Sequence, residues 1–220
     1  MIEYKKSARF AGAMFLLAMV ASLTGGILIQ NVISKPDFMN AILLEKEMII
    51  IGVVLEILNA LAVIGITAAL WMPLKSVSPS MIVGYLGVRV IESVSCVAAA
   101  LIPILLITLG MQDSNNNTVP FANSLNVVRD GIVAYAIPLF FGIGGLLLYI
   151  MLYRSMLVPR YISVWGMIAA LAVMVNMFVP ATAMKPLLAL PIIINEIYLG
   201  VYLLIKGVCV TATHSGNKHS

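Results

Sequence analysis

The chain has 220 residues, of which 62% are hydrophobic and only 10% are charged, and its formal net charge is +4. A soluble domain of this length carries about 25% charged residues, so this composition excludes an ordinary soluble domain. The basic residues are scattered at the ends of apolar segments and form no clustered basic face, which argues against nucleic-acid binding. The mean hydropathy of +1.08 indicates a membrane protein instead.

Six apolar segments are long enough to cross a bilayer, because about 20 apolar residues span about 30 Å of hydrocarbon. They cover residues 10–33, 48–74, 81–110, 131–153, 161–179 and 187–208. The breaks at 34–37, 75–80, 111–120, 154–160 and 180–186 concentrate Pro, Ser, Asn or charged residues. Backbone groups in lipid must be satisfied within the segment, so each span is expected to be an α-helix. The sequence therefore predicts an all-α, polytopic transmembrane six-helix bundle, with residues 1–220 as a single integral membrane domain.

The first segment follows three basic residues, as the apolar part of a signal peptide does. Its apolar run of about 24 residues is longer than the 7–15 residues of a signal sequence. A retained transmembrane helix is therefore expected.

The distribution of lysine and arginine predicts the orientation of the bundle. Eight basic residues fall on the side of the amino terminus, namely Lys5, Lys6, Arg9, Lys75, Arg154, Arg160, Lys206 and Lys218. Four fall on the opposite side, namely Lys35, Lys46, Arg129 and Lys185. The longest loop on that side is expected at about 111–130. Since loops rich in positive charge stay inside, both termini are expected to be cytoplasmic, in a protein of the plasma membrane.

Four ionisable residues lie inside the predicted spans, namely Glu56, Arg89, Glu92 and Glu196. On the translocon scale a charged residue at mid-helix costs roughly 2.5–3.5 kcal/mol, so each must be paired, neutralised or hydrated. Arg89 and Glu92 are three residues apart and share a helix face with Tyr85 and Cys96, so they can reach each other.

Other polar residues extend this pattern to two more spans. Glu56 and Asn59 share a face of the second span, and Asn195 precedes Glu196 in the sixth. The simplest arrangement places the three helices around one polar centre. This gives a candidate intramembrane cluster of Glu56, Asn59, Arg89, Glu92, Asn195 and Glu196. Three carboxyl groups face one guanidinium, and desolvation disfavours an ionised carboxyl, so at least one glutamate is expected to be protonated. Glu56 has no nearby cation in its own helix and is the first candidate.

Two interpretations of this cluster are open. The charges can line a functional polar cavity, in which Arg89 holds an anionic group and a glutamate carries a proton. They can instead lock the helices together, as buried polar networks do in some proteins. Gly142, Gly144 and Gly145 indicate a surface for close helix packing in either case.

The sequence contains no established catalytic or metal-binding pattern. Its two histidines, His214 and His219, lie in the polar tail, and no HExxH, CxxC, P-loop or GxSxG motif occurs. Cys96 and Cys209 are expected at different depths, without a disulfide. No catalytic residue, cofactor or metal is therefore expected. An intramembrane enzyme that uses a carboxyl group as acid or base ranks last among the possible functions.

The stretch ALWMPLKSVSPSMIVGYLGVRVIESV at 69–94 has an apolar helix that ends in a Pro-Leu-Lys turn, and then a helix with Gly-Tyr and Arg-x-x-Glu. It resembles the DUF4386 family of bacterial multi-pass membrane proteins, and the segments at 9–28 and 194–207 look similar to the ends of that family. The resemblance implies a multi-pass membrane fold over nearly the whole chain. It implies no chemistry, because the function of the family is unknown.

The function expected from these observations is a binding or transport-type module for a small solute, an ion or a lipid. Its partners would be membrane lipid and a small solute or proton, and no nucleic acid. The alternative is a structural or regulatory membrane subunit, in which the polar cluster only locks the helices.

Overall fold

The computed structural model describes residues 2–112, 118–180 and 184–207, and within these ranges all regular structure is helical. The elements are α1 (Ile2–Ile33), α2 (Phe38–Leu44), α3 (Lys46–Lys75), α4 (Pro79–Gln112), α5 (Val119–Gly131), the π-helical turn η1 (Ile132–Ala136), α6 (Ile137–Ser155), α7 (Arg160–Asn176) and α8 (Met184–Lys206). The predicted all-α class is thereby confirmed for the described part of the chain.

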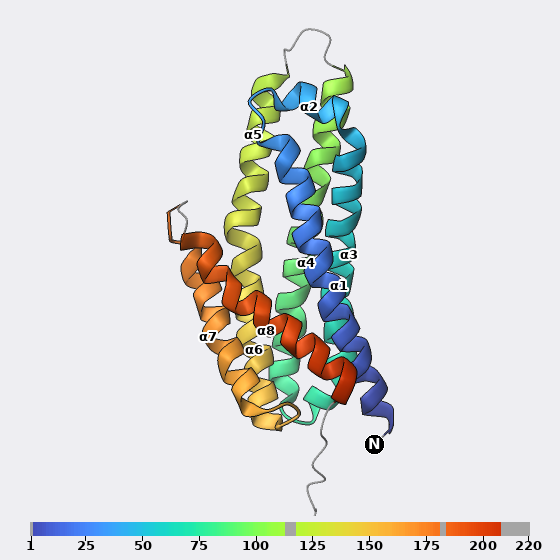
Figure 1. The fold of residues 1–220 in the computed structure, drawn as a ribbon, viewed down its shortest axis with the longest axis vertical. Coiled ribbons are helices and arrows are strands. Elements are labelled where there is room, and N and C mark those ends of the chain that lie inside the picture. The colour runs from blue at the N-terminus through green and yellow to red at the C-terminus, as the bar shows by residue number, and fades with distance from the viewer. Residues whose placement is uncertain (1, 113–117, 181–183, 208–220) are drawn as a thin grey trace, which may run out of the picture.

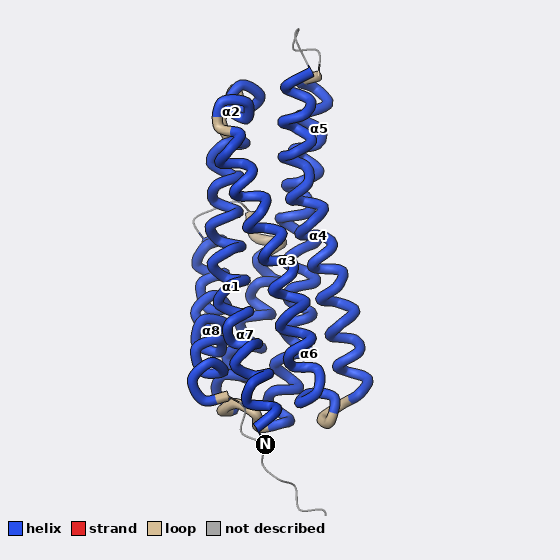
Figure 2. Tube along the Cα trace, turned by 90° about the vertical axis from the view of Figure 1, so that its right-hand side faces the viewer, coloured by secondary structure: helices blue, strands red, loops and turns tan. Residues whose placement is uncertain are grey.

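The long helices stand side by side in an elongated bundle (Figure 1). α3 packs on both α1 and α4, and α5, η1 and α6 form one continuous helical rod that packs on α4 (Figure 2). α7 packs on α6, and α8 crosses the bundle diagonally to pack on α7 and α1. The start of α1 and the end of α8 lie at the same end of the bundle, where Gly207 contacts Lys5.

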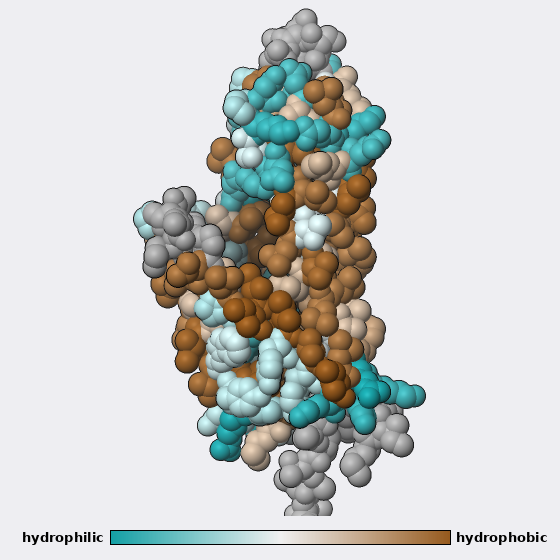
Figure 3. Space-filling view, in the orientation of Figure 1, coloured by the Kyte–Doolittle hydropathy of each residue, from teal (hydrophilic) through white to brown (hydrophobic). Residues whose placement is uncertain are grey.

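The side surface of the bundle is hydrophobic because apolar side chains point outwards from most helices. Leu61, Val94, Ile168 and Ile205 are each more than 60% exposed. Figure 3 shows hydrophobic side chains over much of this surface, a paler area in its lower half, and hydrophilic side chains at the two ends. Five helical segments of the described residues are long and apolar enough to cross a membrane, namely Lys5–Ile33, Lys46–Lys75, Pro79–Gln112, Val119–Ser155 and Leu187–Lys206. The protein has the features of a multi-pass membrane protein.

The predicted span at 161–179 differs from the other five. α7 is apolar but has 17 residues. At 1.5 Å per residue it is about 26 Å long, slightly less than the hydrocarbon thickness of about 30 Å. By length, the described residues therefore contain five candidate spans and one shorter apolar helix.

Helix ends at Ile33, Lys75 and Ser155 confirm the predicted breaks that follow the first, second and fourth apolar segments. The predicted break at 180–186 includes residues 181–183, which lie outside the described residues. So do residues 113–117 of the break at 111–120.

The prediction of a long outside loop at about 111–130 is wrong, because this region contains α5. The polar composition of the segment favours a loop, but Ala122 and Arg129 lie on one helix face and are buried against the bundle. The fourth membrane helix also does not begin at residue 131 as predicted, because α5, η1 and α6 are continuous from Val119 to Ser155. The short helix α2, which the sequence analysis does not predict, buries Phe38 and Ile42 in the same half of the molecule.

Glycine residues hold α1 close to two neighbouring helices. A Cβ atom added at Gly12 would lie 2.5 Å from the carbonyl oxygen of Gly200 in α8. One added at Gly25 would lie 2.9 Å from the carbonyl oxygen of Gly52 in α3. The backbones approach this closely only because these positions have no side chain. The two crossings fix α1 between α3 and α8.

Candidate functional site

A buried ion pair lies at the centre of the site. Arg89 Nη1 donates a hydrogen bond to Glu92 Oε2 at 2.7 Å, and each side chain is only 3% exposed. Both residues belong to α4 and share one helix face, as their spacing predicts. Because a buried pair is screened little by salt or water, the two charges offset each other strongly.

Two aromatic rings and a glycine enclose the guanidinium group of Arg89. Its Cζ atom lies 5.3 Å from the centre of the Tyr85 ring and 5.4 Å from that of Phe141, within range of cation–π interactions. On α6, a Cβ atom added at Gly144 would lie 3.0 Å from Arg89 Nε. The absence of a side chain at Gly144 therefore gives Arg89 its place against α6.

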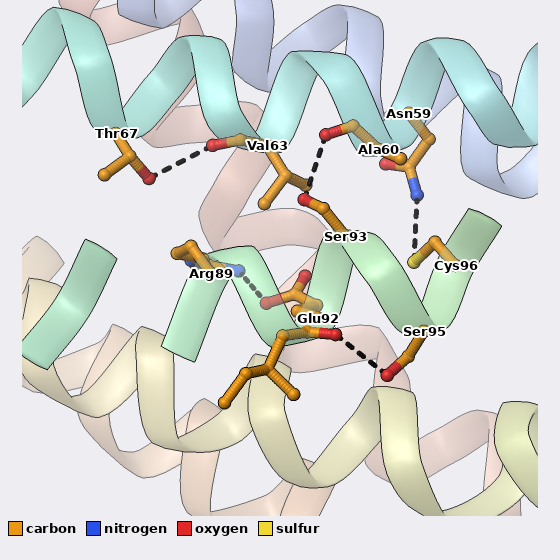
Figure 4. Close-up of polar contacts among 10 residues, drawn as sticks. Asn59, Ala60, Val63, Thr67, Arg89, Glu92, Ser93, Ser95 and Cys96 are labelled. Atoms are coloured by element: carbon orange, nitrogen blue, oxygen red, sulfur yellow. Dashed lines mark hydrogen bonds and ion pairs between the residues drawn. The ribbon is translucent and has the colours of Figure 1, made fainter. Parts of the chain in front are cut away.

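Polar contacts join α3 to α4 beside the ion pair (Figure 4). Ser93 Oγ donates a hydrogen bond to the carbonyl oxygen of Ala60 at 3.0 Å. Asn59 Nδ2 donates to Cys96 Sγ at 3.9 Å. These contacts set the register of the two helices, so that Asn59 and the Arg89–Glu92 pair lie in one region of the bundle.

A cavity of about 170 Å³ lies next to the ion pair, with walls from α1, α3, α4, α6 and α8. Four residues of the predicted cluster line it, namely Asn59, Arg89, Glu92 and Glu196. The rest of the wall is largely apolar and includes Phe15, Met19, Ile66 and Ile192. A water molecule occupies about 30 Å³ in the liquid, so the cavity has room for several waters or one small solute.

Glu196 is an acid of the cavity wall without a partner in the described part of the chain. Its carboxyl group makes no hydrogen bond or ion pair there, although Arg89 and Glu92 act on it electrostatically. The hydroxyl groups of Tyr85 and Tyr149 are buried nearby and also have no hydrogen-bond partner among the described residues. Buried polar atoms are nearly always bonded to protein or water, so this region offers unused polar atoms to water or a ligand.

The structure divides the predicted cluster, because Glu56 does not line the cavity. Glu56 precedes Ala60 by one helical turn, and Arg89 precedes Ser93 by one turn of the antiparallel neighbour. The two charged residues are therefore separated by about 12 Å along the bundle axis. Glu56 faces α1 instead, where a Cβ atom added at Gly26 would lie 3.6 Å from its Oε1 atom.

Glu56 interacts electrostatically with Arg129 of α5. Arg129 is 2% exposed, and its Nη1 donates a hydrogen bond to Gln30 Oε1 at 3.5 Å. The prediction of Arg129 as a loop charge is wrong, because α5 is helical and directs this side chain into the bundle. The signal available in the sequence was weak: Ala122, Leu125 and Arg129 share one helix face within an otherwise polar stretch.

Asn195 contacts α7 and does not line the cavity. Its Nδ2 donates a hydrogen bond to the carbonyl oxygen of Ile162 at 3.1 Å, and the residue is fully buried. It therefore joins α8 to α7, while the next residue, Glu196, faces the cavity. The structure thus brings together Asn59, Arg89, Glu92 and Glu196, and places Glu56 and Asn195 elsewhere.

The residues that line the cavity belong to a part of the chain that matches the model of a protein family. The family described as "Domain of unknown function (DUF4386)" matches residues 10–207, and every residue that lines the cavity falls in this range. The chain belongs to the DUF4386 family. This confirms the resemblance seen at 69–94, at 9–28 and at 194–207. No curated protein and no solved structure matches this DUF4386 protein. Among its described residues, no group of three or more His, Cys, Asp or Glu side chains could hold a metal ion.

Proposed function

We propose that this DUF4386 protein binds a small solute in the cavity among α1, α3, α4, α6 and α8, as a binding or transport-type module of the membrane. The observation that carries the proposal is the composition of the cavity wall. A space of about 170 Å³ combines a largely apolar wall with the carboxyl group of Glu196 and the Arg89–Glu92 pair. Ligand pockets commonly combine an apolar lining with a few polar groups that fix the orientation of the ligand.

The cost of polar groups in a membrane supports this function over a purely structural one. A charged residue at mid-helix costs roughly 2.5–3.5 kcal/mol, and such residues usually mark solute, ion or proton sites. Arg89 and Glu92 offset each other, whereas no described side chain forms an ion pair with Glu196. A ligand or water in the cavity would supply the missing partner.

A structural or regulatory subunit is the second candidate. Arg89 is held by Glu92, by the rings of Tyr85 and Phe141, and against Gly144 on α6. This arrangement by itself locks α4 to α6, as buried ion pairs can do. A helix lock requires neither the cavity nor the unpaired carboxyl group, so it ranks below the binding function. An intramembrane enzyme is the third candidate, and no contact of the described residues favours it.

We further propose six crossings of the plasma membrane by a single domain, with both termini in the cytoplasm. α7 ends and α8 begins well below the upper ends of α1, α3, α4 and α5 in Figure 1. α4 has 34 residues and is about 51 Å long, which exceeds the hydrocarbon thickness by about 20 Å. A bilayer around the lower part of the bundle would therefore be crossed by α7 as well. The excess of basic residues at the end where α1 begins supports the orientation.

Binding of a neutral probe of matching size tests the proposed function. A cavity of about 150 Å³ in another protein holds benzene, so benzyl alcohol is expected to bind the purified full-length protein in detergent. Ala18 lines the cavity on α1, and Ala18→Leu is expected to abolish the saturable component in ligand-detected NMR. Val20→Leu is the matched control, because Val20 lies on the same helix and is 61% exposed. Equal saturable binding of benzyl alcohol to both variants would overturn the proposal. So would the absence of saturable binding of benzyl alcohol and of its cationic and anionic analogues, benzylammonium and benzoate, to the unmodified protein.

A further inference from the structure

The charged side chains in the cavity wall do not balance. Three of the lining residues are ionisable acids or bases with a formal charge, namely Arg89, Glu92 and Glu196. Arg89 and Glu92 form one ion pair with a single positive and a single negative charge. Glu196 therefore leaves a surplus negative charge on the wall when it is ionised.

Arg89 is poorly placed to hold an anionic ligand. Its Nη1 is bonded to Glu92, and its Cζ lies 5.3 Å from the centre of the Tyr85 ring and 5.4 Å from that of Phe141. Its Nε, which has no hydrogen-bond partner among the described residues, is buried against Gly144 on α6. An anion in the cavity would meet a cation that is already paired and two carboxyl groups. This arrangement disfavours the expectation that Arg89 holds an anionic group.

Glu196, unlike Arg89, has no charged partner of its own among the described residues. It lines the cavity, it is partly accessible, and it makes no hydrogen bond or ion pair within the described residues. A carboxylate in a site of low polarity requires an opposite charge or donated hydrogen bonds. An ammonium group provides both, because it carries one positive charge and donates up to three hydrogen bonds.

The rest of the wall fits an apolar body attached to that ammonium group. Phe15 and Met19 of α1, Ile66 of α3 and Ile192 of α8 line the cavity beside Glu196. A volume of about 170 Å³ is slightly above that of a cavity that holds benzene. It suits a single ring or a short aliphatic chain.

One residue of the cavity wall also lies on the exposed side surface of the bundle. α8 packs on α1 and α7, whereas α4 and α6 lie across the cavity from it. Leu23 lines the cavity and is 44% exposed on the hydrophobic side of the bundle. Figure 3 shows a recess above α8 on this face, with hydrophobic side chains below and beside it and hydrophilic side chains above it. Amphiphilic cations collect at membrane surfaces, because anionic lipids attract them and their apolar part partitions into the bilayer.

We propose that the ligand of the cavity is a small organic monocation, whose ammonium group pairs with Glu196 and whose apolar body contacts Phe15, Met19 and Ile192. This inference rests on the proposed function, since it names the chemical class of the solute that the same cavity binds.

Three probes of nearly equal size separate the effect of ligand charge on binding from that of ligand shape. They are benzylammonium, benzyl alcohol and benzoate. Their saturable binding to the full-length protein in uncharged detergent is measured at one pH and salt concentration. The inference predicts at least about tenfold tighter binding of benzylammonium than of benzyl alcohol, and no saturable binding of benzoate. Benzylammonium that binds no better than benzyl alcohol, or benzoate that binds best, overturns it.

The variant Glu196→Gln tests the assignment to this carboxyl group. Gln keeps the size of the side chain and removes its charge, so the preference for benzylammonium over benzyl alcohol is expected to fall to about one. Glu47→Gln is the matched control, because Glu47 is an exposed carboxyl on α3 outside the cavity, and it is expected to keep the preference. A preference retained in Glu196→Gln overturns the inference. If this variant does not fold, the relative binding affinities of the three probes for the unmodified protein still test the inference.

The two proposals fail in different ways. If benzyl alcohol binds and Ala18→Leu abolishes it, the cavity function stands, and only the relative affinity of benzylammonium decides the cation inference. If no probe shows saturable binding that Ala18→Leu abolishes, the binding function itself is wrong, and the cation inference is wrong with it.

Discussion

Arg89 illustrates how a charge is accommodated within an apolar bundle. Glu92 accepts its hydrogen bond at 2.7 Å, the rings of Tyr85 and Phe141 lie within range of cation–π interactions, and Gly144 leaves space for the side chain. Removal of one partner of a buried ion pair typically costs about 3–5 kcal/mol, since the remaining charge has no counter-ion. Removal of both charges avoids that penalty.

We therefore expect Arg89→Ala to destabilise the protein more than the double variant Arg89→Ala with Glu92→Ala. Thermal melting in detergent of both single variants, the double variant and the unmodified protein gives the coupling energy. For contacting residues this energy is about 0.5–3 kcal/mol. Lys35 and Glu45 provide the control, because they form an exposed ion pair whose coupling is expected to be below about 1 kcal/mol. Strictly additive losses at Arg89 and Glu92 would show that the two residues do not stabilise each other.

Local spacing predicts the Arg89–Glu92 pair, because residues three apart on a helix are neighbours on its surface. The interaction between Glu56 and Arg129 could not be predicted in this way. It joins distant parts of the chain, and it exists only because α5 is helical and turns Arg129 inward. Asn195 and Glu196 show a second limit of the sequence. Adjacent residues on a helix point about 100° apart, so only the packing of α8 decides which of them faces the cavity.

At the scale of whole helices, hydropathy predicts the apolar segments well and the polar helices poorly. The bounds of α3 and α4, Lys46–Lys75 and Pro79–Gln112, lie within a few residues of the predicted spans. α5 contains Asn, Ser, Arg and Asp, and its burial against the bundle, not its average polarity, stabilises it as a helix. Hydropathy also does not reveal that η1 joins α5 to α6, because a π-helical turn is a local feature of the backbone.

The crossing of α1 and α8 depends on glycine and gives a prediction at this scale. An added Cβ atom at Gly12 would lie 2.5 Å from the carbonyl oxygen of Gly200 and 2.7 Å from the backbone nitrogen of Leu204. Backbone atoms cannot move aside as a flexible side chain can. We expect Gly12→Ala to lower the free energy of unfolding by about 1–3 kcal/mol, as overpacking does.

Gly84→Ala is the matched control for this variant. A Cβ atom there would meet only Leu147 Cδ1, at 3.9 Å, which is an ordinary contact. Because alanine is the better helix former by about 0.5–1 kcal/mol, this change is expected to leave stability equal or slightly higher. Thermal melting in the same detergent compares the two variants. If Gly12→Ala were as stable as Gly84→Ala, α1 and α8 would not cross at Gly12.

The whole molecule has two hydrophilic ends and a hydrophobic side surface (Figure 3). Among the described residues, basic residues are more numerous at the end where α1 begins and α8 ends, and the positive-inside rule predicts that this end lies in the cytoplasm. Charge counting predicts orientation from sequence because it needs only the side on which each residue falls. The number of membrane crossings is harder to predict from the sequence, since α7 is slightly shorter than the hydrocarbon is thick.

Single cysteines test the orientation and the sixth crossing together. The background carries Cys96→Ala and Cys209→Ala, so that each introduced cysteine is the only thiol. Ser124→Cys on α5 and Ser76→Cys between α3 and α4 are both at exposed positions on opposite ends of the bundle. We expect a membrane-impermeant maleimide to label Ser124→Cys in intact cells, and to label Ser76→Cys only after the membrane is permeabilised.

Phe178 decides whether α7 crosses the membrane. It lies two residues after the end of α7, and its side chain is 84% exposed. If α7 starts at the cytoplasmic end and spans the bilayer, Phe178→Cys lies at the outer surface and reacts in intact cells, as Ser124→Cys does. If α7 ends within the hydrocarbon, the thiol is shielded from the water-soluble reagent, and neither intact nor permeabilised cells are labelled at this position. Labelling of Phe178→Cys only after permeabilisation would place both ends of α7 in the cytoplasm, and the proposed six crossings would be wrong.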